Sequence, residues 1–159
     1  MSASSARRFY VAHPERIEYR VHSATDAGMV NQDGAVIITA GSTPTAALLA
    51  AFETWNQVAG TTVAFATPTP EPDGAAMPDG INLVTFEDTP NNRALTFGAI
   101  AVTRLLSDVD GALEDTDIVF NPEMPFSTTL EEGTFDIQGT LTHGSATPSD
   151  STTAVRRAR

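Results

Sequence analysis

Hydrophobic and polar residues alternate over residues 16–23, where Ile17, Tyr19 and Val21 are separated by charged or polar side chains. A period of two is typical of a strand that buries one face. This segment is therefore predicted to be the first strand of a sheet. The same pattern and flanking turn residues predict further strands at 35–39, 62–67, 81–87, 99–106 and 117–121.

The hydrophobic period changes over residues 45–58, where Phe52, Trp55 and their apolar neighbours fall on one helical face. We expect the Thr43 side chain to accept a backbone N–H bond at the start of this helix, and Gly60 to end it. Aromatic residues at helical spacing are usually core residues. Phe52 and Trp55 are therefore predicted to pack inside the protein rather than to line a ligand groove.

A second helix is predicted over Phe135–His143. Phe135, Ile137 and Leu141 are spaced to face a core. Asp136 lies near the expected N-terminus, where the positive end of the helix dipole favours an acidic side chain. If the protein has a chemical site, this helix is the expected place for it.

The chain between these helices is predicted to hold strands and loops. Residues 69–80 are rich in proline and glycine and are predicted to form a surface loop. One strand, one helix and then several strands without an intervening helix indicate an α+β fold rather than a doubly wound sheet.

The charge balance excludes several classes of function. The chain has 159 residues, of which 9 are basic and 20 acidic, giving a formal net charge of −11. Such a surface repels phosphate backbones, which argues against nucleic-acid binding. There is no cysteine, which excludes disulfides, thiolate zinc ligands and thiol nucleophiles. No apolar run is long enough to span a membrane, and residues 1–15 form an N-terminal extension without the apolar segment of a signal peptide.

The composition changes after His143. Residues 144–159 contain three of the nine arginines, one of the twenty acidic residues and no aromatic residue. A segment with so little apolar surface cannot offset the entropy lost on ordering, so it is predicted to be disordered. The predicted organisation is thus an extension at 1–15, a folded region at 16–143 and a tail at 144–159.

An acidic stretch contains Asp108, Asp110, Glu114, Asp115 and Asp117. Calcium prefers several oxygen ligands from one turn, but this stretch lacks the spacing of an EF-hand loop. Clusters of like charge are usually solvated loops. We predict a solvated, negatively charged turn here, with a calcium site as the alternative.

The other polar residues suggest no catalytic group. His13 and His22 have no helical partner or carboxylate motif near them and are predicted to be solvated. Glu18 and Glu53 lie on polar faces and are not paired as an acid and a base. Residues 127–129 lack the G-x-S-x-G setting of a serine nucleophile.

Five segments nevertheless resemble a known protease family in their order and spacing. They are IEYRV (17–21), AFETWNQVAGTTVAF (51–65), INLVTF (81–86), GALEDTDIVFN (111–121) and FDIQGTLTH (135–143). Over residues 16–143 the chain resembles the matrixin-like branch of the metzincin zinc metalloproteases. The resemblance implies a twisted mixed β-sheet of about five strands with two long helices, a zinc cofactor, protein or peptide substrates and an extracellular location. It also implies a zinc held by the three histidines of H-E-x-x-H-x-x-G-x-x-H.

His143 stands at the first histidine of that motif, and the chain departs from the motif directly afterwards. Gly144 replaces the general-base glutamate, and Thr147 and Thr153 replace the second and third histidines. A single imidazole without the glutamate cannot make the site. We therefore expect a truncated active-site helix and an inactive chain without a catalytic residue. His143 is predicted to be the remaining metal ligand, with a plain polar residue on an exposed helix end as the alternative.

A frameshift is our hypothesis for this departure. If one base was lost just after the codon for His143, a histidine codon CAC would be read as a codon beginning AC, which encodes threonine. Thr147 and Thr153 stand at the two histidine positions. With the G- and C-rich codons that an arginine-rich, lysine-free chain suggests, GSATPSDSTTA restores to EIGHALGLDHS. The tail is therefore predicted to be an out-of-frame copy of the active-site sequence.

Three interpretations stay open at the level of sequence. The first is a zinc metalloendopeptidase lineage whose present chain is inactive. The second is a non-catalytic acidic α+β module that binds peptides through an edge strand. The third is a pseudogene product or sequencing artefact that folds poorly because an apolar face is left uncovered. Substrate specificity and oligomeric state are not predicted.

Overall fold

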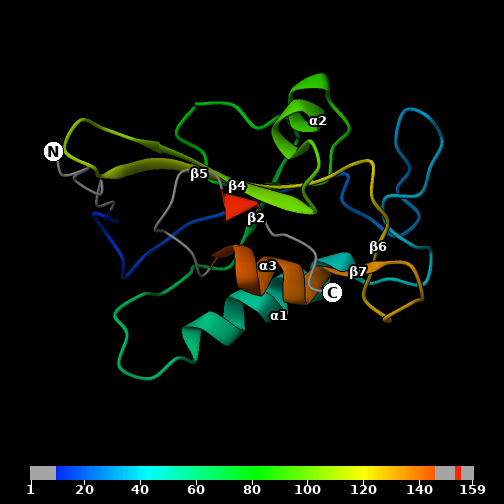
Figure 1. Cartoon of the computed structure of the whole chain (residues 1–159). Coiled ribbons are helices and arrows are strands. Elements are labelled where there is room, and N and C mark those ends of the chain that lie inside the picture. The colour runs from blue at the N-terminus through cyan, green and yellow to red at the C-terminus, as the bar shows by residue number, and fades with distance from the viewer. Residues whose placement is uncertain (1–9, 146–152, 155–159) are drawn as a thin grey trace, which may run out of the picture.

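The computed structural model describes residues 10–145 and 153–154, and three helices and eight strands lie within these ranges. Five strands form a mixed sheet (Figure 1). In spatial order they are β2 (Thr69–Glu71), β1 (Arg20–His22), β3 (Leu83–Thr85), β5 (Leu113–Phe120) and β4 (Ala101–Ser107). β4 runs antiparallel to β5, whereas the other pairs are parallel. The prediction of an α+β fold with a mixed sheet of about five strands is confirmed.

The remaining elements lie at the edge and on the faces of this sheet. The two-residue strand β8 (Thr153–Ala154) pairs antiparallel with β4, and β6 (Phe126–Ser127) pairs with β7 (Phe135–Asp136). Helices α1 (Pro44–Asn56) and α3 (Ile137–Ser145) pack together on one face, and α2 (Pro90–Thr96) lies on the other (Figure 1). None of the described helices is long and apolar enough to span a membrane.

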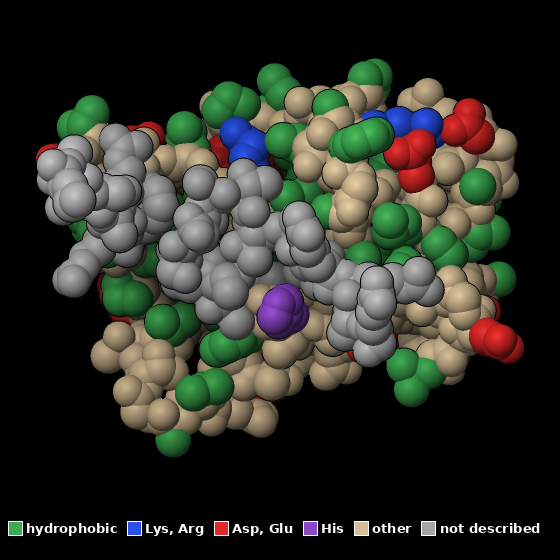
Figure 2. Space-filling view, viewed as in Figure 1, with side chains coloured by type: hydrophobic (Ala, Val, Ile, Leu, Met, Phe, Trp, Pro, Cys, Tyr) green, Lys and Arg blue, Asp and Glu red, His purple; other side chains and the backbone are tan. Residues whose placement is uncertain are grey.

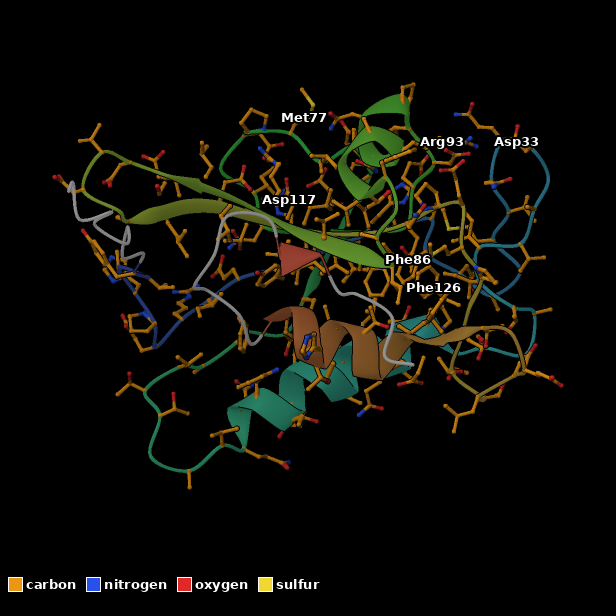
Figure 3. The ribbon with its side chains drawn as sticks, in the orientation of Figure 1. Asp33, Met77, Phe86, Arg93, Asp117 and Phe126 are labelled. Atoms are coloured by element: carbon orange, nitrogen blue, oxygen red, sulfur yellow. The ribbon has the colours of Figure 1, made fainter. Side chains whose placement is uncertain are left out.

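Aromatic side chains join the sheet to the helical layer. The rings of Phe86 and Phe120 stack with centroids 4.0 Å apart, and Phe126 meets both edge-on (Figure 3). Phe52 of α1 lies 5.3 Å from the ring of Tyr19, beside β1. Stacked and edge-to-face rings add to the stabilisation that comes from their burial. The prediction that Phe52 is a core residue is confirmed.

The structure shifts several predicted strands. The strands predicted at 81–87, 99–106 and 117–121 correspond to β3, β4 and β5, and the prediction at 16–23 corresponds to the shorter β1. In place of the strand predicted at 35–39 there are two isolated bridges, an antiparallel one between Val36 and Val30 and a parallel one between Ile38 and Phe126.

The strand predicted at 62–67 is reduced to a single parallel bridge between Ile17 and Phe65, in which Ile17 N–H donates to the Ala64 carbonyl and Ala66 N–H donates to the Ile17 carbonyl. The Asn56 side chain binds the N–H and the carbonyl of Phe65 itself. The neighbour of β1 is instead β2, inside the segment predicted as a loop. Its place there is fixed by an ion pair from Arg20 to Glu71 of 2.6 Å.

The start of α1 differs from the prediction. The Thr43 side chain does not cap the helix, and its backbone N–H donates to Thr128 Oγ1 (3.0 Å). The helix ends before Gln57 rather than at Gly60. Sequence analysis also missed α2, although it begins with the same Thr-Pro pair. There Thr89 Oγ1 accepts a hydrogen bond from Asn92 N at 3.0 Å.

The acidic stretch is only partly a solvated turn. Asp108 and Asp110 lie in a turn in which Asp108 Oδ1 accepts two backbone hydrogen bonds. Asp115 and Asp117, however, belong to β5 and are buried beside Arg104. Residues two apart on a strand project from the same face of the sheet. Both side chains project from a face that other residues cover, so the prediction of a solvated turn is wrong for them.

The two N-terminal histidines also behave differently from one another. His13 is exposed, as predicted, and lies 3.3 Å from Glu15. The prediction for His22 is wrong, since it is only 5 % exposed. Gly74 packs so closely over His22 and Glu87 that a Cβ at position 74 would lie 3.0 Å from His22 Cδ2.

Most of the predicted tail lies outside the described residues, as does most of the N-terminal extension. The predictions of disorder and of an altered reading frame beyond position 145 therefore stay predictions.

Candidate functional site

Helix α3 carries the residue that the sequence analysis singled out. Asp136 lies directly before it, and Asp136 Oδ2 accepts a hydrogen bond from Gly139 N at 2.6 Å. An acidic cap satisfies a free N–H group and complements the helix dipole. The predicted helix at Phe135–His143 is thus confirmed from Ile137 onward, while its first two residues form β7.

The orientation of α3 is fixed by its contact with α1. Ile137 and Leu141, one turn apart, are fully buried in the core shared with α1. Trp55 of α1 is partly buried rather than fully enclosed, and its indole N–H donates to the Thr142 carbonyl oxygen (3.1 Å). His143 follows Leu141 by two positions, which places it about 200° around the helix. His143 is accordingly exposed, on the face turned away from the core.

An open groove runs beside His143. It has a volume of about 570 Å³ and lies where the last turns of α1 meet α3. Its lining residues are Thr54, Trp55, Asp136, Gln138, Gly139, Thr142 and His143. Most of these groups are neutral, and the Asp136 carboxylate already accepts the capping bond. Asp136 is thus the one acidic side chain that lines the groove with His143, and its Oδ2 serves the helix cap.

The residues present do not make a zinc site. Among residues 10–145 and 153–154, no group of three or more His, Cys, Asp or Glu side chains could hold a metal ion. Gly144 follows His143 within α3, and a glycine supplies neither a ligand nor a general base. Position 147 lies outside the described residues, and Thr153 is part of β8. Because one imidazole leaves most of the coordination to solvent, the donor set does not fit the metal.

A cluster of charged side chains lies elsewhere, buried between β4 and β5. Arg104 Nη2 lies 2.5 Å from Asp117 Oδ2 and 3.4 Å from Asp115 Oδ2. Burial raises the pKa of Asp117 to about 7, an effect that the nearby Asp115 charge increases and the hydrogen bond from Arg104 opposes. The sequence does contain a signal for this cluster: two acids spaced by two on one strand, with an arginine on the neighbouring strand. The prediction placed these acids in a solvated turn instead.

A second ion-pair network, centred on the half-buried Arg93, holds α2 in place. Arg93 Nε donates to Asp88 Oδ1 at 2.5 Å, and its Nη2 lies 2.8 Å from Asp33 Oδ2 (Figure 3). Figure 2 shows basic and acidic side chains meeting at the upper right of the same view. Hydrogen bonding to Arg93 lowers the pKa of Asp88 below its ordinary value. This network connects α2 to the segments that carry Asp33 and Glu123, so we assign it a structural role.

Comparison of the chain with protein-family models, with curated proteins and with solved structures gives no match. The resemblance to matrixin-like metalloproteases therefore rests on the five segments of sequence and on the position of His143.

Proposed function

We propose that the chain descends from a secreted zinc metalloendopeptidase and is itself inactive. The observation that supports this proposal is the setting of His143. The resemblance assigns this residue as the first zinc ligand, and it is exposed on a capped helix that packs with α1 beneath a mixed sheet. A histidine used only for packing would have no reason to face away from the core.

Helical geometry gives the physical reason for the loss of activity. Residues four apart lie on the same face of a helix, so a second imidazole at position 147 would converge with His143 on one ion. The chain has Thr147 there and Gly144 at the position of the base. Gly144 cannot accept a proton from metal-bound water, so we expect peptide hydrolysis by this route to be lost.

The purified chain is expected to retain no stoichiometric zinc and to leave casein intact. Both can be measured, by elemental analysis after dialysis and by a fluorescent casein assay. A second chain, in which the restored sequence EIGHALGLDHS follows His143, is expected to bind one zinc per molecule. Its matched control carries His143→Ala in the restored sequence and should lose the metal. Chelator-sensitive proteolysis by the unaltered chain would contradict the proposal.

The nucleotide sequence gives an independent test. Adding one A between the two G bases of the Gly144 codon would create GAG, a glutamate codon. The two threonines would become histidines only if the codons before them, those of Ala146 and Thr152, both end in C. We expect both to do so. Any other base at either position would remove that histidine from the restored frame and would contradict the frameshift hypothesis.

A peptide-binding module is the second candidate, and one observation favours it. The outer edge of β4 pairs with β8, with Val102 opposite Ala154 and Thr103 opposite Thr153. An edge strand that accepts one extended segment can accept another. Relatives that share residues 144–159 in frame would support this candidate over the first. Absence of saturable binding in titrations with extended peptides would reject it.

A further inference from the structure

Two buried aspartates share one arginine at the centre of the sheet. Asp115 and Asp117 are spaced by two along β5 and so project from the same face. They are 1 % and 0 % exposed. Arg104 lies directly opposite Asp117 in the antiparallel register with β4 and reaches both carboxylates through Nη2.

The same carboxylates hold a long loop against the sheet. Asp115 Oδ2 accepts hydrogen bonds from the backbone N–H groups of Asp79 (2.9 Å) and Gly80 (3.1 Å). Asp117 Oδ1 accepts one from Leu83 N at 3.1 Å. Figure 3 labels Asp117 on the sheet and Met77 on this loop. The segment 79–83 is thus attached to β5 by side chains, just before the backbone ladder of β3 and β5 begins.

The charges of this cluster do not balance when both acids are ionised. Two carboxylates then face one guanidinium, and Asp115 Oδ1 is buried without a hydrogen-bond partner among the described residues. A buried charge without a partner is unfavourable. A single proton held by the pair would leave one carboxylate facing one guanidinium and restore neutrality.

We propose that the Asp115–Asp117 pair is a pH-dependent latch, which holds segment 79–83 against β5 in mildly acidic solution and loosens as the shared proton is lost. The charged and titratable groups that face Asp117 are Arg104 from β4, Asp115 from β5 and Tyr19 beside β1. The Asp79 carboxylate belongs to the loop and accepts a hydrogen bond from Ile81 N. The latch does not depend on protease ancestry.

The direction of the pH dependence follows from linkage. Asp117 has a pKa raised from 3.8 to about 7 in the folded protein. An acid of this kind contributes stability that is fully present below its unfolded pKa and is lost as the pH rises through its folded pKa. The equilibrium constant for folding should therefore fall between pH 5 and pH 8, by up to roughly tenfold per pH unit below the folded pKa.

The wild-type chain allows a direct measurement. The ¹³Cγ shift of Asp117 should titrate near neutral pH, not near pH 4. After correction for the intrinsic rate, hydrogen exchange at the Asp79, Gly80 and Leu83 amides should speed up from pH 6 to pH 8. An Asp117 that titrates below about pH 4 would overturn the proposal, as would exchange rates that do not depend on pH.

Two variants separate the latch from general acid effects. Asp117→Asn should flatten the change in unfolding midpoint between pH 5 and pH 8. Asp88→Asn is the matched control, because Asp88 is also a buried aspartate bonded to an arginine but has a lowered pKa. It should destabilise the protein at neutral pH and keep the wild-type slope. Equal slopes in wild type and Asp117→Asn would refute the latch. Protection of the loop by millimolar calcium at pH 8 would also refute it and indicate a cation site.

Discussion

At the scale of single residues, close packing and buried charge pairs are the features that could not be predicted from the sequence. Gly74 has no unusual backbone conformation, yet a Cβ there would lie 2.5 Å from Glu87 Cβ and 2.9 Å from Glu87 Cγ. Neither atom is the free end of a side chain. The glycine is therefore required by the approach of its neighbours and not by a turn.

Gly74→Ala is expected to lower the free energy of unfolding by about 1–3 kcal/mol, the usual range for overpacking a tight site. Urea denaturation would measure the change. Gly41→Ala is the matched control, since the nearest atom to its added Cβ would be Glu131 Oε1 at 3.7 Å, an ordinary contact. If both variants lose the same stability, close approach at Gly74 is not the cause.

Residue patterns also misplaced the buried acids. Asp115 and Asp117 look like members of a solvated acidic run, because their neighbours Asp108 and Asp110 are in a turn. What buries them is the loop at 79–83, which lies more than thirty positions earlier in the chain. A local window of sequence contains no information about that contact.

At the scale of elements, hydrophobic periodicity predicted the long helix α1, helix α3 from Ile137 onward and the strands of the sheet centre. It failed where hydrogen bonds from side chains decide the outcome. The Asn56 side chain binds the N–H and carbonyl of Phe65, where only a single bridge to Ile17 forms, and Thr89 rather than Thr43 caps a helix. Both Thr-Pro pairs look alike in sequence, and only their surroundings distinguish them.

The caps provide a matched pair of tests. Thr89→Ala should lower the free energy of unfolding by about 1 kcal/mol, because it removes the acceptor for Asn92 N at the start of α2. Thr43→Ala should have a smaller effect, because the Thr43 side chain makes no capping bond. Thermal unfolding of the two variants would rank them. A larger loss for Thr43→Ala would show that the Thr89 cap does not account for the difference in stability between the two variants.

At the scale of the whole molecule, the order of elements was sufficient to predict an α+β fold, and His143 was correctly placed on a helix. The short helix α2 was missed because its seven residues carry no long hydrophobic repeat. The groups that would complete a metal site could not be predicted from their usual positions, since other residue types stand there. The core formed by the described residues is nevertheless covered by α1 and α3, with Ile137 and Leu141 enclosed.

The contact between Trp55 and Thr142 gives the protein a built-in optical reporter. Trp55 is the single tryptophan of the chain, and its indole bridges the two helices of the lower layer. Emission from an indole moves to longer wavelength when water replaces a protein acceptor. Separation of α3 from α1 would thus register in the intrinsic fluorescence spectrum without any label, and could be followed in real time.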